Sequence, residues 1–145
     1  MTANYEIMAP VGSRESLAAA FQAGADSVYF GIEALNMRAH SAHHFTVGDL
    51  HDIAAQCAAH GVKSYLTVNT IIYEHELNDT MALVRQLAAI GVDALLVQDM
   101  GLAKLCRGII PLHASTQCDT RTKEKALWLR DHGMERVVLA RELST

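Results

Sequence analysis

Short apolar runs recur along the chain, and each one passes into a cluster of polar residues. Helix-like stretches lie between these runs, and a glycine follows four of them, at positions 24, 61, 91 and 133. The alternation predicts parallel strands joined by helical crossovers, the pattern of an α/β protein. The predicted strands cover residues 6–12, 27–31, 64–69, 94–99, 112–117 and 137–142.

Apolar residues at helical spacing mark five predicted helices between these strands. They cover residues 13–23, 46–60, 76–90, 101–107 and 122–132. Ser13 is a suitable N-cap for the first helix, and Gly24 is a suitable stop signal. We expect Trp128 to anchor the fifth helix on the sheet.

Two arrangements of parallel strands remain, an open Rossmann-like sheet and a (βα) barrel. The first strand is followed by Ala-Pro-Val-Gly-Ser, which lacks the glycine-rich turn of a dinucleotide-binding fold. Polar residues alternate in two interior runs, at Tyr65, Thr67 and Asn69, and again at His113, Ser115 and Gln117. Central strands of an open sheet are usually apolar throughout, so this polar face favours a barrel lumen.

The chain has 145 residues, whereas a complete eight-fold barrel needs about 250. We therefore expect residues 1–145 to be a single domain without an internal linker. This domain would be the N-terminal part of a longer protein, an incomplete TIM-like barrel of about six strands and five helices. The alternative is a natural short protein with an open six-stranded sheet.

The charge balance is mildly acidic, with 12 Lys and Arg against 16 Asp and Glu. This predicts no general attraction to nucleic acid or to a membrane surface, although Arg121, Lys123 and Lys125 form a local basic cluster. No apolar stretch is long enough to span a bilayer, and the first residues do not resemble a signal peptide. The sequence therefore predicts a cytoplasmic protein.

The three cysteines are far apart and match no disulfide framework or metal motif. We therefore predict no metal site and no cofactor site within this chain. Lys63 begins its strand, at the edge opposite to a barrel's active site, which disfavours Schiff-base chemistry.

Ligands of parallel α/β proteins bind at the carboxyl ends of the strands, where this chain places its polar clusters. Candidates for substrate binding are Arg38, Asn69, Gln98, Gln117 and Arg141. Candidates for catalysis are His113, Ser115, Asp99 and Glu142, with no individual role assigned.

Each catalytic candidate has an alternative interpretation. His113 and Ser115 face the same way but stand about 7 Å apart along a strand, and no nucleophile elbow surrounds the serine. Polar lining or a hydrogen-bonded interior histidine is the alternative to a hydrolytic dyad. Asp99 and Glu142 fit either acid–base work or an ion-pair network that shapes loops.

Seven stretches resemble the N-terminal part of the collagenase-like peptidase family of unassigned catalytic type. They are residues 8–12, 24–31, 36–39, 66–70, 91–99, 112–117 and 138–143. Within that family the chain most resembles the branch that hydroxylates ribosomal RNA. Sister branches hydroxylate transfer RNA or act in ubiquinone synthesis.

The resemblance implies that the full-length protein modifies RNA, either rRNA or tRNA, by hydroxylation, with prephenate as a required metabolite. It also implies a later cysteine-bearing segment that holds an iron–sulfur cluster in several members. The alternatives are a collagenase-like protease, and a non-catalytic fragment that self-associates through open strand edges. We expect this stretch alone to be inactive.

Overall fold

A computed structural model describes residues 5–32 and 45–143, and six strands in these ranges form one sheet. Every pair of neighbouring strands is parallel, and the order across the sheet is the order along the chain. Such an order is that of a barrel wall, because a doubly wound sheet reverses its strand order. The strands are β1 (Met8–Pro10), β2 (Ser27–Gly31), β3 (Lys63–Val68), β4 (Ala94–Val97), β5 (Leu112–Ala114) and β6 (Met134–Val137).

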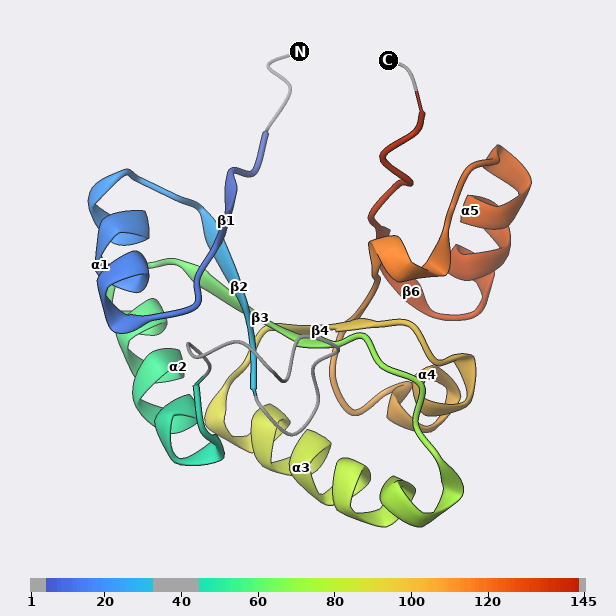
Figure 1. Cartoon of the computed structure of the whole chain (residues 1–145), viewed down its shortest axis with the longest axis horizontal. Helices are drawn as coiled ribbons and strands as arrows, with labels where there is room; N and C mark the ends of the chain where they lie inside the picture. The colour runs from blue at the N-terminus through green and yellow to red at the C-terminus, as the bar shows by residue number, and fades with distance from the viewer. Residues whose placement is uncertain (1–4, 33–44, 144–145) are drawn as a thin grey trace.

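Helices connect the strands and lie on the outside of the curved sheet. Figure 1 shows them following one another in an arc, from α1 and α2 through α3 to α4 and α5, open between the two termini. The α-helices are α1 (Arg14–Gln22), α2 (Leu50–Ala59), α3 (Leu77–Ile90), α4 (Met100–Cys106) and α5 (Lys123–Asp131). Short 3₁₀ turns are η2 (Val47–Asp49), η3 (Glu74–Glu76) and η4 (Thr116–Cys118). The predicted α/β, incomplete barrel-like fold is confirmed for the described residues.

The two faces of the sheet carry different side chains. Leu66 and Val68 of β3 belong to the main core between the sheet and the helices. Tyr65 belongs to a separate small cluster with Ala94 and Leu96, on the concave face. Because strand side chains alternate between faces, this division confirms that β3 presents a partly polar face toward the lumen.

Local signals in the sequence account for the helix ends. Ser13 accepts a hydrogen bond from Ser16 N at 3.1 Å, while the Ser16 hydroxyl accepts one from Ser13 N at 3.0 Å. This reciprocal pair caps α1 at the predicted residue. At the other end of a helix, Gly91 follows α3 with φ of 87°, a left-handed conformation that favours glycine.

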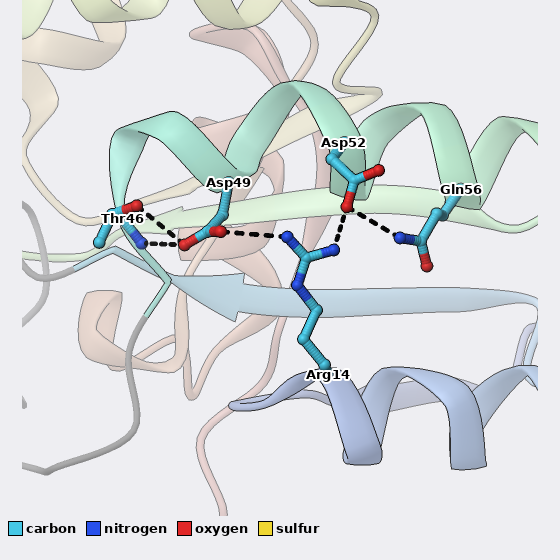
Figure 2. A network of polar contacts seen from close by, with 5 residues as sticks. All are labelled: Arg14, Thr46, Asp49, Asp52 and Gln56. Atoms are coloured by element: carbon cyan, nitrogen blue, oxygen red, sulfur yellow. Dashed lines mark hydrogen bonds and ion pairs between the residues drawn. The ribbon is translucent and has the colours of Figure 1, made fainter.

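Arg14 ties the start of α1 to the start of α2, as Figure 2 shows. Its guanidinium donates to Asp49 at 3.0 Å and also to Asp52. Asp49 accepts from the backbone and hydroxyl of Thr46, and Asp52 accepts from Gln56 at 2.9 Å. Hydrogen bonds from Thr46 and Arg14 lower the pKa of Asp49, and those from Arg14 lower the pKa of Asp52. Two helix starts are thereby held together at the carboxyl edge of the sheet.

Two sequence predictions about the last βα unit were wrong. The final strand covers Met134–Val137 instead of 137–142, because it begins directly after Gly133, whose φ is 98°. Beyond it, Val138 and Ala140 still donate to neighbouring carbonyls, but without a regular ladder. Trp128 is 48% exposed and stacks on His132 instead of anchoring α5.

Within the described residues, no helix is both long and apolar enough to cross a membrane.

The left-handed conformation of Gly91 gives a first testable prediction. Gly91→Ala should lower the free energy of unfolding by about 1 kcal/mol, because a Cβ there meets no neighbouring atom and adds only backbone strain. Gly48→Ala is the matched control, since Gly48 does not have a positive φ and its added Cβ would make an ordinary contact. Urea unfolding followed by circular dichroism would compare the two, and equal losses would contradict the prediction.

Candidate functional site

At the amino-terminal edge of the sheet, Glu6 and Arg136 form a two-pronged ion pair across the concave face. Arg136 Nη1 donates to Glu6 Oε1 at 2.8 Å, and Nη2 donates to Oε2 at 2.7 Å. The Tyr65 hydroxyl donates to the same carboxylate at 2.6 Å, and Lys63 Nζ lies 3.7 Å from it. Glu6 precedes β1 and Arg136 lies in β6, so the pair joins the first and last strands.

Opposite charges stabilise each other in the Glu6–Arg136 pair. Hydrogen bonds from Arg136 keep the pKa of Glu6 far below its usual value against the opposing effect of burial, and the hydrogen bond with Glu6 raises the pKa of Arg136. Burial, followed by the hydrogen bond to Glu6, raises the pKa of Tyr65 to about 12. The groups are therefore held in fixed protonation states at neutral pH, which suits a structural closure of the barrel base better than proton transfer.

His113 lies on the concave face of β5, next to this network. Its side chain is buried, and its ring makes a T-shaped contact with that of Tyr65, with 4.8 Å between ring centroids. Burial, assisted by the nearby positive charge of Arg136, lowers the pKa of His113 to about 4. The imidazole is thus neutral at physiological pH.

At the opposite, carboxyl edge, a polar residue follows each of three neighbouring strands. Val68 of β3 is in register with Val97 of β4, which is in register with Ala114 of β5. Asn69, Gln98 and Ser115 come next, and by alternation they continue the concave face. We call these three residues the polar row. Asn69 Oδ1 is buried and has no hydrogen-bond partner among the described residues, so within them it is an acceptor available to a ligand or a water molecule.

Asp99, a candidate for catalysis, makes two structural contacts. Its Oδ1 accepts from Leu102 N at 2.9 Å and so caps α4, while Oδ2 accepts from Ile72 N at 3.2 Å. The carboxylate therefore connects the segment after β3 to the start of α4.

Ser115 and Gln117 separate at the end of β5. The Ser115 hydroxyl accepts from Gln117 N at 3.3 Å and caps η4, and no hydrogen bond joins it to His113 in the described part of the chain. Gln117 lies within η4 and is exposed, so it does not continue the face of the strand as the sequence pattern predicts. The chain leaves the ladder here because η4 leads into Asp119, whose φ is 51°.

The remaining candidates lie beyond β6 or outside the described residues. Arg141 and Glu142 are exposed in the turn after β6, and Glu142 lies 3.8 Å from Arg121. Both residues follow β6 at the carboxyl edge of the sheet. Arg38 falls outside the described residues.

The described residues lack a cluster of metal ligands. They include no group of three or more His, Cys, Asp or Glu that could hold a metal ion. Cys57 and Cys106 are buried on different helices, and burial raises the pKa of both thiols to about 11. The cysteines of this chain therefore do not fit an iron–sulfur cluster.

Sequence reasoning missed the pairing of Glu6 with Arg136. The signal was present in part, because Glu6 alternates with Met8 and Arg136 with Val138, both of which pack on the concave cluster. A charged residue two positions from a lumen-facing apolar residue on a strand indicates an ion pair in the lumen. The sequence does not reveal the pairing, because Glu6 and Arg136 are 130 residues apart along the chain.

Comparison with known proteins identifies the relatives of this chain. A family model described as "Peptidase family U32" matches residues 12–145. The chain is 47% identical to a collagenase of Porphyromonas gingivalis over 142 residues, which cover 97% of this chain and 34% of that protein. It is 41% identical to the 23S rRNA 5-hydroxycytidine C2501 synthase of Escherichia coli over 139 residues, 96% of this chain and 21% of that protein. These matches confirm the resemblance seen in the sequence motifs.

Further relatives share the same stretch. The tRNA hydroxylation protein P1 of Bacillus subtilis is 29% identical over 147 residues, 99% of this chain and 35% of that protein. The chain thus spans about a third or less of the relatives it matches. A solved U32 peptidase superposes with a TM-score of 0.80 at 14% identity, over 96% of this chain and 60% of that one. A fructose-1,6-bisphosphate aldolase from Coccidioides immitis has a TM-score of 0.63 at 16% identity, covering 90% and 49% of the two chains, and supports the barrel-like fold.

The ion pair at the closed edge gives a second prediction. A double-mutant cycle of Glu6→Gln and Arg136→Met should show a coupling energy of about 1–2 kcal/mol, because a two-pronged, partly buried pair exceeds an exposed one. The exposed pair Arg130–Asp131 is the control, and its cycle should show almost no coupling. Coupling energies are measured by denaturant unfolding. Equal values in both cycles would show that the Glu6–Arg136 pair contributes no more to stability than an exposed ion pair.

The buried histidine gives a third prediction, on acid stability. Between pH 6.5 and about 4, an unfolded chain binds a proton that native His113 excludes, so stability should fall by on the order of 3 kcal/mol. The lowered pKa of Glu6 acts in a different window, because its stabilisation is complete above pH 4.5 and is lost as the pH falls below that value.

His113→Phe should remove the loss between pH 6.5 and 4, whereas His51→Phe, at an exposed position of α2, should keep it. Unfolding free energies measured across this range would test the comparison. If NMR showed that His113 of the native protein titrates near pH 6.5, the prediction would be contradicted.

Proposed function

The chain belongs to peptidase family U32, and from this membership we propose that the full-length protein hydroxylates a base of ribosomal or transfer RNA. In this proposal the stretch of residues 1–145 contributes part of the barrel wall and part of the substrate mouth. The support comes from relatives whose names describe rRNA and tRNA hydroxylation and which match nearly all of this chain.

The observation that carries the proposal is the polar row at the carboxyl edge. Asn69, Gln98 and Ser115 offer neutral donors and acceptors, and no group in the part of the chain that the structure describes bonds to the buried Asn69 Oδ1. A nucleobase presents donors and acceptors along one planar edge, which carboxamide side chains can match with paired hydrogen bonds. A base that has to be modified must also leave its stack, and a concave barrel mouth accommodates an extruded base.

Hydrolysis of peptides is the second candidate, because the relative with 47% identity is named a collagenase. The described side chains give it less support. The Ser115 hydroxyl caps η4, and His113 packs against Tyr65 instead of hydrogen-bonding to the serine. A serine nucleophile needs a base within hydrogen-bond reach.

Hydroxylation of a base is an oxidation, and the oxidising chemistry has no counterpart among the described residues. The cysteines of this chain do not fit an iron–sulfur cluster. The residues of this chain would instead bind and orient the base. A cluster elsewhere in the protein, the use of prephenate and a cytoplasmic location stay predictions.

Deletion of the gene, followed by mass spectrometry of nucleosides from rRNA and tRNA, tests the proposal. A hydroxylated nucleoside should disappear and should return on complementation with the wild-type gene. Gln98→Ala should restore it about 5- to 150-fold less efficiently, since a lost hydrogen bond to substrate costs about 1–3 kcal/mol. Lys104→Ala, at an exposed position on the outer helix α4, is the matched control and should restore it fully.

Two results would overturn the proposal. Unchanged hydroxylated nucleosides in the deletion strain would remove its basis. Cleavage of denatured collagen by the purified intact protein, abolished by Ser115→Ala, would establish the peptidase instead.

A further inference from the structure

Residues 119–125 and 139–142 lie side by side at the carboxyl edge of β5 and β6. Thr120 and Leu139 form a parallel bridge, and Ala140 N donates to Thr120 O at 3.0 Å. The two segments therefore make one continuous surface, next to the Ser115 end of the polar row.

This surface gathers four exposed cations, which we call the basic edge: Arg121, Lys123, Lys125 and Arg141. Arg121 is paired with two carboxylates of the same surface, because it lies 2.6 Å from Asp119 and 3.8 Å from Glu142. The remaining three cations stay uncompensated by any ion pair among the described residues, and Glu124 is the one further acid in the segment.

The backbone adds to the same polarity. Helix α5 begins at this edge, with Thr122 as its N-cap and its first N–H groups pointing back toward the edge. The N-terminal end of a helix carries a partial positive charge, which reinforces the nearby lysines. Lys125 Nζ donates to the Asp119 carbonyl at 3.2 Å, a neutral acceptor that leaves the ammonium charge in place.

The opposite side of the carboxyl edge carries negative charge. Residues 70–84, which lead from β3 into α3, contain Glu74, Glu76 and Asp79 but no lysine or arginine. All three carboxylates are exposed. The edge is therefore basic on the β5–β6 side and acidic on the β3 side, with the polar row between.

We infer that the basic edge binds the sugar–phosphate backbone of the RNA substrate, which reaches the polar row from the β5–β6 side. The inference rests on the proposed function, because it takes RNA as the substrate. Phosphate contacts set the position of a nucleic acid, whereas base contacts select its sequence. The acidic side around Glu74 repels phosphates, so the RNA backbone approaches from the β5–β6 side.

The test measures the salt dependence of RNA binding by the intact protein. The probe is a short fluorescein-labelled single-stranded RNA of mixed sequence, and its Kd is followed by anisotropy over a series of KCl concentrations. Lys123→Gln and Arg141→Gln should each weaken binding and reduce the slope of log Kd against log salt by about 0.7, because each removes one phosphate contact. Arg141→Lys keeps the charge and should keep the slope.

Two variants serve as matched controls. Arg130→Gln alters the opposite end of the same helix, where the arginine pairs with Asp131, and should leave the slope unchanged. Glu74→Gln removes a negative charge from the acidic side and should leave binding unchanged or tighten it.

The outcomes separate this inference from the proposed function. An unchanged slope in Lys123→Gln and Arg141→Gln, with RNA hydroxylation intact, overturns the basic edge alone, as does a slope that falls equally in Arg130→Gln. Failure of the wild-type protein to bind the RNA also overturns it. The expected slopes together with unchanged nucleosides in the deletion strain would instead uphold the basic edge and overturn hydroxylation.

Discussion

The two-pronged ion pair between Glu6 and Arg136 links parts of the molecule that the backbone leaves apart. Each strand hydrogen-bonds only to its neighbours in sequence, so β1 and β6 lie at opposite ends of the sheet. A carboxylate before β1 and a guanidinium in β6 nevertheless meet at 2.7–2.8 Å, with Tyr65 of β3 donating to the same carboxylate. The contact requires a curved sheet, and its matched charges stabilise that curvature from the concave side.

The closed edge and the carboxyl edge consequently carry different chemistry. Charged groups neutralise one another at the amino-terminal edge, where barrel residues commonly serve stability. Neutral carboxamides and a hydroxyl follow three strand ends that are in register at the carboxyl edge, where barrel proteins bind their ligands. The parallel arrangement of the strands produces this division, because it places all their amino-terminal ends at one edge of the sheet and all their carboxyl ends at the other.

The relatives named as a collagenase and as an rRNA-modifying synthase match the same stretch, at 47% and 41% identity. A stretch that matches two differently named proteins to this degree describes the common scaffold more than the reaction. The difference between peptide and RNA substrates therefore has to be sought in particular side chains at the carboxyl edge, and in experiments on the whole protein. Our proposal of an RNA substrate rests on the polar row and the basic edge.

By itself, the sequence determined the α/β class, the six strands and five helices, and the edge where polar residues gather. Periodicity, the Ser13 cap and the stop glycines are local signals, and each acts within a few residues. Tertiary structure decided the rest. In the folded chain β6 begins at Met134, and Gln117 lies in η4 instead of on the strand face. Ser115 and Asp99 act as helix caps, and Glu6 pairs with Arg136. Those outcomes depend on which distant groups meet after folding, and local periodicity contains no information about such encounters.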